Sequence, residues 1–263
     1  MLPYTFHRGA RPLLISIPHA GTAVPDEIAN RLTETGCDLP DTDWYLDKLY
    51  EFAGALGASV LAATYSRYVV DLNRSADSAA LYASQMTSPV CALQTFARHD
   101  IYVRGAEPDE AEIAARVECY WQPYHQCIAE ELWRMRSEHG YALLWDAHSI
   151  VSRVPELFEG ELPQFNLGTR DNASCPQSAA QALLHSLEEE GRYSAVLNGR
   201  FKGGYITQAY GRPDDRVWAV QLELAQRTYM HESPRGAWEP GRAAAASLRI
   251  ESLLRQFLAS AHP

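Results

Sequence analysis

The chain has 263 residues, of which 46% are hydrophobic and 21% are charged, as in folded globular proteins. A chain of this length buries a substantial core, so fibrous and disordered classes are excluded and one domain spanning residues 1–263 is expected. The 33 acidic residues outnumber the 23 lysines and arginines, and the net charge is −10. Without a basic run to bind phosphates, nucleic acid is not an expected partner.

The five cysteines are odd in number and form no Cys-x-x-Cys pair, which indicates reduced, mostly structural thiols. The N-terminus lacks the apolar core of a signal peptide, and no apolar run reaches the roughly 18 residues that cross a bilayer. We therefore expect a cytoplasmic protein with no membrane partner. The sequence predicts no particular oligomeric state.

The first half of the chain predicts strands that end in polar residues. A buried strand is expected over 13–17, where Pro18 ends it just before His19. Apolar spacing predicts a helix over 44–56, with Asp43 as a possible cap and Gly57 at its end. Residues 59–71 are expected to form one or two strands that lead into the segment 71–74.

The second half continues this alternation. Residues 108–140 predict two helices or one helix kinked near Pro123, followed by a buried strand over 141–145 that leads to His148. A helix over 176–190, strands over 193–197 and 217–224, and a closing helix over 241–259 complete the pattern.

Alternating strands and helices predict an α/β fold with three layers, in which a mostly parallel or mixed sheet carries helices on both faces. Ligands bind such folds outside the carboxyl ends of the strands. His19, Asn73, Arg74 and His148 are all expected at such ends.

Two histidines in matching positions indicate a metal site. A catalytic zinc ion commonly has three protein ligands and an open position, and two histidines with one carboxylate form a frequent set. Asp43 is the first choice for the third ligand, although it is nearly as well suited to cap a helix. Asp146 is the alternative ligand, or it orients His148 from behind.

Glu223 is the candidate catalytic residue. It lies between two leucines of a predicted strand, where an ionised carboxylate is costly unless it faces a polar cleft or a cation. There it would act as a general base on water and then protonate the leaving amine. A structural ion pair is the alternative role.

Arginines near the strand ends predict a small anionic substrate. Arg74 and Asn73 suit a carboxylate, as does Arg67. Pairing with neighbouring acids is the alternative role for both arginines, and it suits Arg67 better than Arg74. The segment 203–207 brings Gly204, Tyr205 and Thr207 near a ligand or merely forms a turn. G-x-S-x-G, H-E-x-x-H, Walker and G-x-G-x-x-G motifs are all missing, which argues against serine hydrolases and nucleotide-binding proteins.

The motifs together resemble N-formylglutamate amidohydrolases. They are SIPHAG at 16–21, SRYVVDLNR at 66–74, WDAHS at 145–149, GGYIT at 203–207, QLE at 221–223 and YM at 229–230. The resemblance implies hydrolysis of N-formyl-L-glutamate to L-glutamate and formate, the last step of one bacterial route of histidine degradation. It also implies a zinc ion and a fold similar to zinc-dependent exopeptidases, of the phosphorylase/hydrolase type.

The resemblance also assigns roles. Zinc carboxypeptidases bind a substrate carboxylate with D-x-N-R, use a histidine followed by serine as a ligand, and use a late glutamate in catalysis; 71–74, His148 and Glu223 occupy similar places. Those enzymes take two ligands from H-x-x-E, but Thr22 stands where that glutamate would be, and Asp43 matches an acidic position of the formylglutamate family.

A second departure, Gln208-Ala209, falls where relatives are expected to be more basic, and it bears on substrate specificity. The alternatives are a metal-dependent deacylase or carboxypeptidase for another N-acyl amino acid, and a non-catalytic carboxylate-binding homologue.

Overall fold

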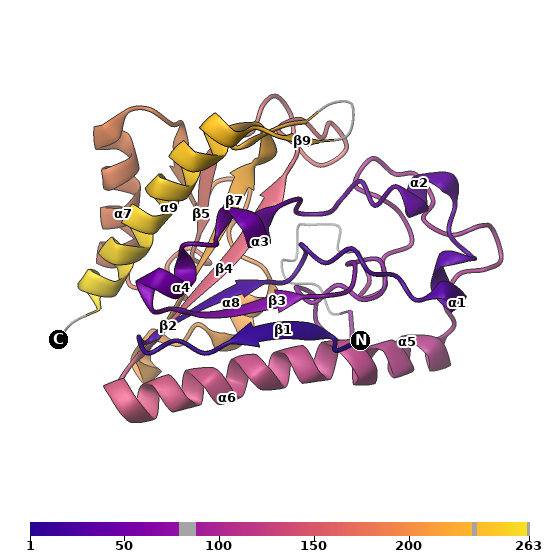
Figure 1. Cartoon of the computed structure of the whole chain (residues 1–263), viewed down its shortest axis with the longest axis horizontal. Coiled ribbons are helices and arrows are strands. Elements are labelled where there is room, and N and C mark those ends of the chain that lie inside the picture. Colours follow the sequence, from indigo (N-terminus) through magenta and orange to yellow (C-terminus); the bar gives the residue numbers. More distant parts are fainter. Residues whose placement is uncertain (79–87, 233–235, 262–263) are drawn as a thin grey trace.

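The fold is seen in a computed structural model that describes residues 1–78, 88–232 and 236–261 (Figure 1). Within these ranges, seven strands form the main sheet in the order β1-β3-β2-β4-β7-β5-β6. Their bounds are β1 Tyr4–His7, β2 Leu13–Ile17, β3 Ser59–Ala63, β4 Ala142–Ile150, β5 Phe165–Gly168, β6 Ala195–Leu197 and β7 Val217–Ala225. A separate hairpin pairs β8 Met230–His231 with β9 Ala237–Trp238.

The centre of the sheet is parallel, and three strands outside it, β1, β5 and β6, run the other way. β3, β2, β4 and β7 are parallel neighbours, whereas β1 pairs antiparallel with β3 and β5 pairs antiparallel with β7. The prediction of a mixed α/β sheet is therefore confirmed. All five residues of β2 and all nine of β4 are buried, as expected for strands covered on both faces.

Helices cover both faces of the sheet (Figure 1). Alternate side chains of β2 and β4, such as Ile15 and Trp145, pack with α7 Gln177–Glu190 and α9 Pro240–Ser260 on one face. Their neighbours in sequence, Leu14 and Leu144, pack on the other face with α6 Gln122–His139 and Ile206. This alternation follows from the two-residue period of a strand, and it confirms helices on both faces.

The predicted helix over 44–56 is wrong as a single element. Two short helices form instead, α3 Leu46–Leu49 and α4 Ala53–Leu56, and Gly57 ends the second in a left-handed conformation. Tyr45 precedes α3 with φ of 61°, and no side chain caps that helix. Asp43 is not a cap because its carboxylate turns toward the sheet, where it contacts His148.

The helical region over 108–140 is continuous but changes its winding. It consists of α5 Glu110–Arg116, a π-helical turn η1 Val117–Trp121, and α6, in which Pro123 occupies the first turn. In place of the predicted break or kink near Pro123, the helix has a π turn just before this proline. Because proline has no N–H, Pro123 cannot donate a helical hydrogen bond to the preceding turn, which is where the winding changes from α to π.

Short helical elements complete the chain, namely α1 Asp26–Ala29, α2 Glu34–Cys37, α8 Tyr205–Tyr210, η2 Pro213–Asp215 and η3 Gln226–Thr228. Among the described residues, none of the helices combines the length and hydropathy required to span a bilayer. The five cysteines are free thiols, and three of them are buried.

Candidate metal centre and active site

The site forms where β2, β4 and β7 lie side by side. His19 follows the end of β2 by two residues, whereas His148 and Glu223 lie within β4 and β7. His148 is therefore not beyond a strand end as predicted, because β4 continues to Ile150. The parallel register places His148 beside Glu223 and Asp146 beside Gln221, so four polar side chains gather on two neighbouring strands.

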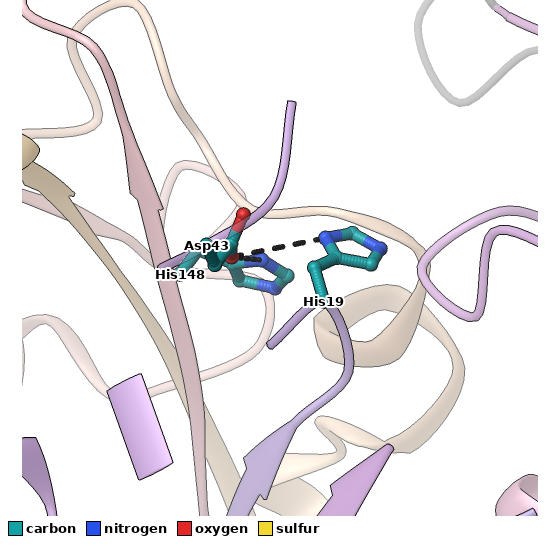
Figure 2. A group of neighbouring side chains, drawn as sticks. All are labelled: His19, Asp43 and His148. Atoms are coloured by element: carbon teal, nitrogen blue, oxygen red, sulfur yellow. Dashed lines mark hydrogen bonds and ion pairs between the residues drawn. The ribbon is translucent and has the colours of Figure 1, made fainter. Parts of the chain in front are cut away.

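Three buried side chains, His19, Asp43 and His148, converge at this edge (Figure 2). Their potential ligand atoms lie within 4.8 Å of one another. Asp43 Oδ2 is 3.1 Å from His148 Nδ1 and 3.9 Å from His19 Nδ1, and Figure 2 shows this carboxylate facing both rings. Asp43 Oδ2 also accepts a hydrogen bond from the backbone N–H of Ser149 at 3.1 Å.

A carboxylate supports the far side of each imidazole. His19 Nε2 lies 2.8 Å from Asp71 Oδ1, and His148 Nε2 lies 2.9 Å from Asp146 Oδ2. Such contacts orient metal-binding histidines and leave the opposite nitrogen for the ion. His19 Nδ1 is buried without a hydrogen-bond partner among the described residues, which is costly unless another group binds there.

Two nitrogens and one carboxylate oxygen, all buried and directed at one point, form a donor set that fits a divalent cation such as zinc. Asp43 faces the Nδ1 atoms of both rings, whereas Asp146 contacts the opposite side of His148. The geometry thus favours Asp43 over Asp146 as the third ligand.

The two histidines differ in their electrostatic surroundings. Burial and the nearby Arg67 guanidinium lower the pKa of His19, although Asp71 opposes them. Burial also disfavours protonated His148, but Asp146 and Asp43 outweigh it and raise the pKa of His148 well above its usual value. In the absence of a cation, His148 is therefore the more readily protonated of the two rings.

Arg67 lines the cavity, but its guanidinium is already engaged with the supporting residues of the site. Its Nη2 donates to Asp71 Oδ2 at 2.7 Å, its Nη1 lies 4.0 Å from Asp43 Oδ1, and the guanidinium rests on the Phe96 ring. Burial alone would raise the pKa of Asp71, but Arg67, His19 and Arg74 hold it well below its usual range. Arg67 therefore keeps Asp71 ionised as the acceptor for His19.

Asn73 links three parts of the site. Its side-chain oxygen accepts from the backbone N–H of Ile206 at 2.8 Å, which fixes the amide orientation. Its Nδ2 then lies 3.2 Å from Asp146 Oδ2 and 2.9 Å from His148 Nε2. Asn73 thus connects α8, through Ile206, to the pair Asp146 and His148. Its side-chain amide is already engaged within the protein.

Arg74 is the half-buried cation at the open side. Its Nε donates to Ser88 Oγ at 3.1 Å and its Nη1 donates to the Asn73 carbonyl at 3.0 Å. Among the described residues, Nη2 has no hydrogen-bond partner, so the guanidinium retains capacity to donate to a carboxylate.

Glu223 is a buried carboxyl group at the cavity wall. Burial is the largest influence on it and raises its pKa to about 8, while His148 opposes that shift. Gln221 Nε2 donates to its Oε2 at 3.2 Å, and Gln221 Oε1 accepts from the Gly204 N–H at 2.7 Å. A carboxyl group with a pKa near neutrality is suited to accept and return a proton.

A cavity of about 720 Å³ opens onto these groups. Its lining includes His19, Asn73, His148 and Glu223 together with cationic side chains, which are Arg67, Arg74, Arg98, Arg104, Arg200 and Lys202. Gly203 and Gly204 also contribute, but Tyr205 and Thr207 are not among the lining residues. Tyr205 packs near Trp121 and His125, and Thr207 Oγ1 donates to the Gly204 carbonyl.

The sequence motifs did not reveal every part of the site. Gln221, which orients Glu223, was present in a recognised motif without an assigned role, although its two-residue spacing from Glu223 places both on one face of β7. Nothing in the sequence around Phe96 and Ser88 indicates a role in the site. Their contacts with Arg67 and Arg74 are seen only in the folded chain.

The family model for N-formylglutamate amidohydrolase matches residues 11–230. The chain belongs to this family. It is 48% identical to N-formylglutamate deformylase of Pseudomonas putida, over 97% of this chain and 95% of that protein. It is 50% identical to the protein of the same name from Pseudomonas aeruginosa, over 97% and 96% of the two chains.

Solved structures agree with this assignment. N-formylglutamate amidohydrolase from Ralstonia eutropha JMP134 superposes with a TM-score of 0.83 at 25% identity, over 99% of this chain and 98% of that one. A protein from Agrobacterium tumefaciens shares the fold, with a TM-score of 0.77 at 16% identity over 99% and 96% of the two chains. The predicted resemblance to this family of amide hydrolases is thus confirmed.

Proposed function

We propose that this protein hydrolyses N-formyl-L-glutamate to L-glutamate and formate with a divalent cation, most simply zinc. The observation that carries the proposal is the buried cluster of His19, Asp43 and His148 beside Glu223 in an open cavity. Relatives of nearly half-identical sequence are named N-formylglutamate deformylases, which supports this substrate. The reaction would complete a route of histidine degradation in the cytoplasm.

His19, Asp43 and His148 would hold the cation, and Asp71 and Asp146 would orient the two imidazoles. When bound, the cation would polarise the formyl carbonyl and make a nearby water molecule more acidic. The raised pKa of Glu223, about 8, keeps its proton affinity close to that required for transfer at neutral pH.

Glu223 would accept a proton from the attacking water as the new C–O bond forms at the formyl carbon. It would return that proton to the amide nitrogen as the C–N bond breaks, which releases formate and the free amine of glutamate. Gln221 would hold the carboxyl group in place through its 3.2 Å hydrogen bond.

Arg74 would bind one substrate carboxylate through Nη2, which has no hydrogen-bond partner within the part of the chain that the structure describes. Arg200 lines the same cavity, is exposed, and has no ion-pair partner among the described residues. Two such cations in a protein of net charge −10 favour a dicarboxylate over a monocarboxylate. Arg67 would act indirectly, because Asp71 already occupies it.

The test is formate release from N-formyl-L-glutamate, measured before and after treatment with a chelator and again after zinc is restored. We expect activity to disappear and return. N-formyl-L-glutamine and N-acetyl-L-glutamate provide the comparison, since the first lacks one carboxylate and the second enlarges the acyl group. Full activity in metal-free protein would contradict the metal role, and faster N-acetyl hydrolysis would favour another deacylase.

A further inference from the structure

The segment 66–74 carries Arg67, Asp71, Asn73 and Arg74, yet it is irregular. It forms turns rather than a strand, although every residue from 66 to 73 is buried. Buried backbone outside regular structure must find hydrogen-bond partners elsewhere. The N–H groups of the segment bond to Ala23, to Val90 and to acceptors within the segment itself, whereas several of its carbonyl groups accept from one helical rod, α5-η1-α6, which runs along the lower edge of Figure 1.

Three side chains of this rod donate to three carbonyl groups of the segment. Arg116 Nη1 donates to the Val69 carbonyl at 3.1 Å, and His125 Nε2 donates to the Leu72 carbonyl at 2.9 Å. Trp121 Nε1 donates to the Arg74 carbonyl at 2.9 Å. The last two contacts lie on either side of Asn73, directly behind the residues that face the cavity.

The π turn explains how these side chains share one face. Residues 116 and 121 are five apart, which would separate them by about 140° around an ideal α-helix of 3.6 residues per turn. In a π turn the hydrogen bonds join residues five apart, so such residues lie nearly above one another. The turn η1 Val117–Trp121 therefore brings Trp121 onto the side of Arg116, and His125 follows one α-helical turn later.

Trp121 and His125 also stabilise each other. Their rings stack with centroids 3.8 Å apart and an interplanar angle of 25°. A carbonyl oxygen only accepts, so His125 Nε2 carries the proton, and the Tyr210 hydroxyl lies 2.9 Å from Nδ1 while it also donates to the His125 carbonyl at 3.0 Å. Neither Trp121 nor His125 is among the cavity-lining residues, so both act through the backbone of the segment.

We propose that Trp121 and His125 are positioning residues for this site, which hold the 72–74 backbone so that Arg74 meets a substrate carboxylate. The inference rests on the proposed function of Arg74. It predicts that loss of the indole N–H changes substrate affinity more than the chemical step, because Trp121 contacts Arg74 itself, whereas Asp71 and Asn73, which contact His19 and His148, keep their own hydrogen bonds to Arg67 and Ile206.

The experiment measures kcat, KM and zinc content for Trp121→Phe, His125→Leu, His125→Gln and Arg74→Ala. Trp121→Phe keeps the ring but loses the donor, and we expect KM to rise about fivefold with kcat within about twofold of wild type. His125→Leu should raise KM further, and His125→Gln should restore it because the glutamine amide donates to the Leu72 carbonyl. Trp133→Phe, on the exposed face of α6, is the matched control and should keep wild-type constants.

Amide hydrogen exchange of the 69–75 region provides a readout independent of turnover. We expect exchange there to be about tenfold faster in His125→Leu than in wild type or Trp133→Phe. A raised KM in Arg74→Ala with unchanged KM and unchanged exchange in Trp121→Phe and His125→Leu would overturn the positioning role alone. An unchanged KM in Arg74→Ala would refute the carboxylate clamp, and accelerated exchange would then still support the backbone role of His125.

Discussion

The buried His125 ring makes a quantitative prediction about stability and pH. Burial lowers its pKa to about 4 from the ordinary 6.5. The unfolded chain therefore binds a proton between these values while the folded protein does not. The contribution of the neutral ring to the free energy of unfolding is therefore complete above pH 6.5 and is lost as pH falls toward 4. The difference of about 2.5 pKa units between the unfolded and folded states corresponds to about 3 kcal/mol.

Urea unfolding at several pH values between 4 and 7 provides the assay, with wild type compared with His125→Gln. Glutamine does not titrate, so wild type should lose about 3 kcal/mol more free energy of unfolding than the variant over this interval. Taking the difference removes the contributions of groups that the two proteins share. His185→Gln, which replaces an exposed histidine of α7, is the control and should follow wild type. Parallel curves for wild type and His125→Gln would refute the assignment of a neutral buried ring.

Three further substitutions test the site itself. Glu223→Gln should reduce kcat about 10²–10⁴-fold while zinc content stays at the wild-type level, and comparable turnover would remove Glu223 from proton transfer. Asp43→Ala should abolish stoichiometric zinc binding, measured by elemental analysis, whereas Asp146→Asn should weaken it only about 10–100-fold; the reverse order would make Asp146 the ligand. Gly204→Ala places a Cβ 2.4 Å from Asn73 Nδ2, so it should lower the free energy of unfolding by about 1–3 kcal/mol and raise KM. Gly54→Ala, where the new Cβ meets nothing within 4 Å, is its control, and equal effects would contradict the steric argument.

The central strands could be predicted from sequence because burial on both faces leaves a continuous apolar run. Such a run gives no signal for where a strand ends, however. β4 extends through Asp146 and His148 to Ile150 because β7 pairs with it along its whole length, and His148 near its end faces the cavity. β1 and β5 were missed because each has only four residues and depends on pairing with a distant strand.

The residues of the proposed metal centre and Glu223 were easier to predict than the residues that contact them. His19, Asp43, His148 and Glu223 carry chemical signals of their own, and the structure brings them to one edge of the sheet. Asp71 was recognised only within a motif, and its contact with His19 joins residues 52 positions apart. Trp121 and His125 have the spacing of ordinary amphipathic helix residues, so only the π turn and the carbonyl groups they meet distinguish them.

The wide sequence separation of the site residues determines when the site can assemble during synthesis of the chain. Asp43 and His148 meet across 105 positions, and the contact depends on β4 taking its place beside β2. During synthesis the first 140 residues contain His19 and Asp43 but neither β4 nor β7. The donor set therefore assembles only when β4 has emerged and paired, and Glu223 joins it with the later arrival of β7. Ribosome-bound chains truncated before β4 should thus fail to retain zinc at this centre, whatever their helical content.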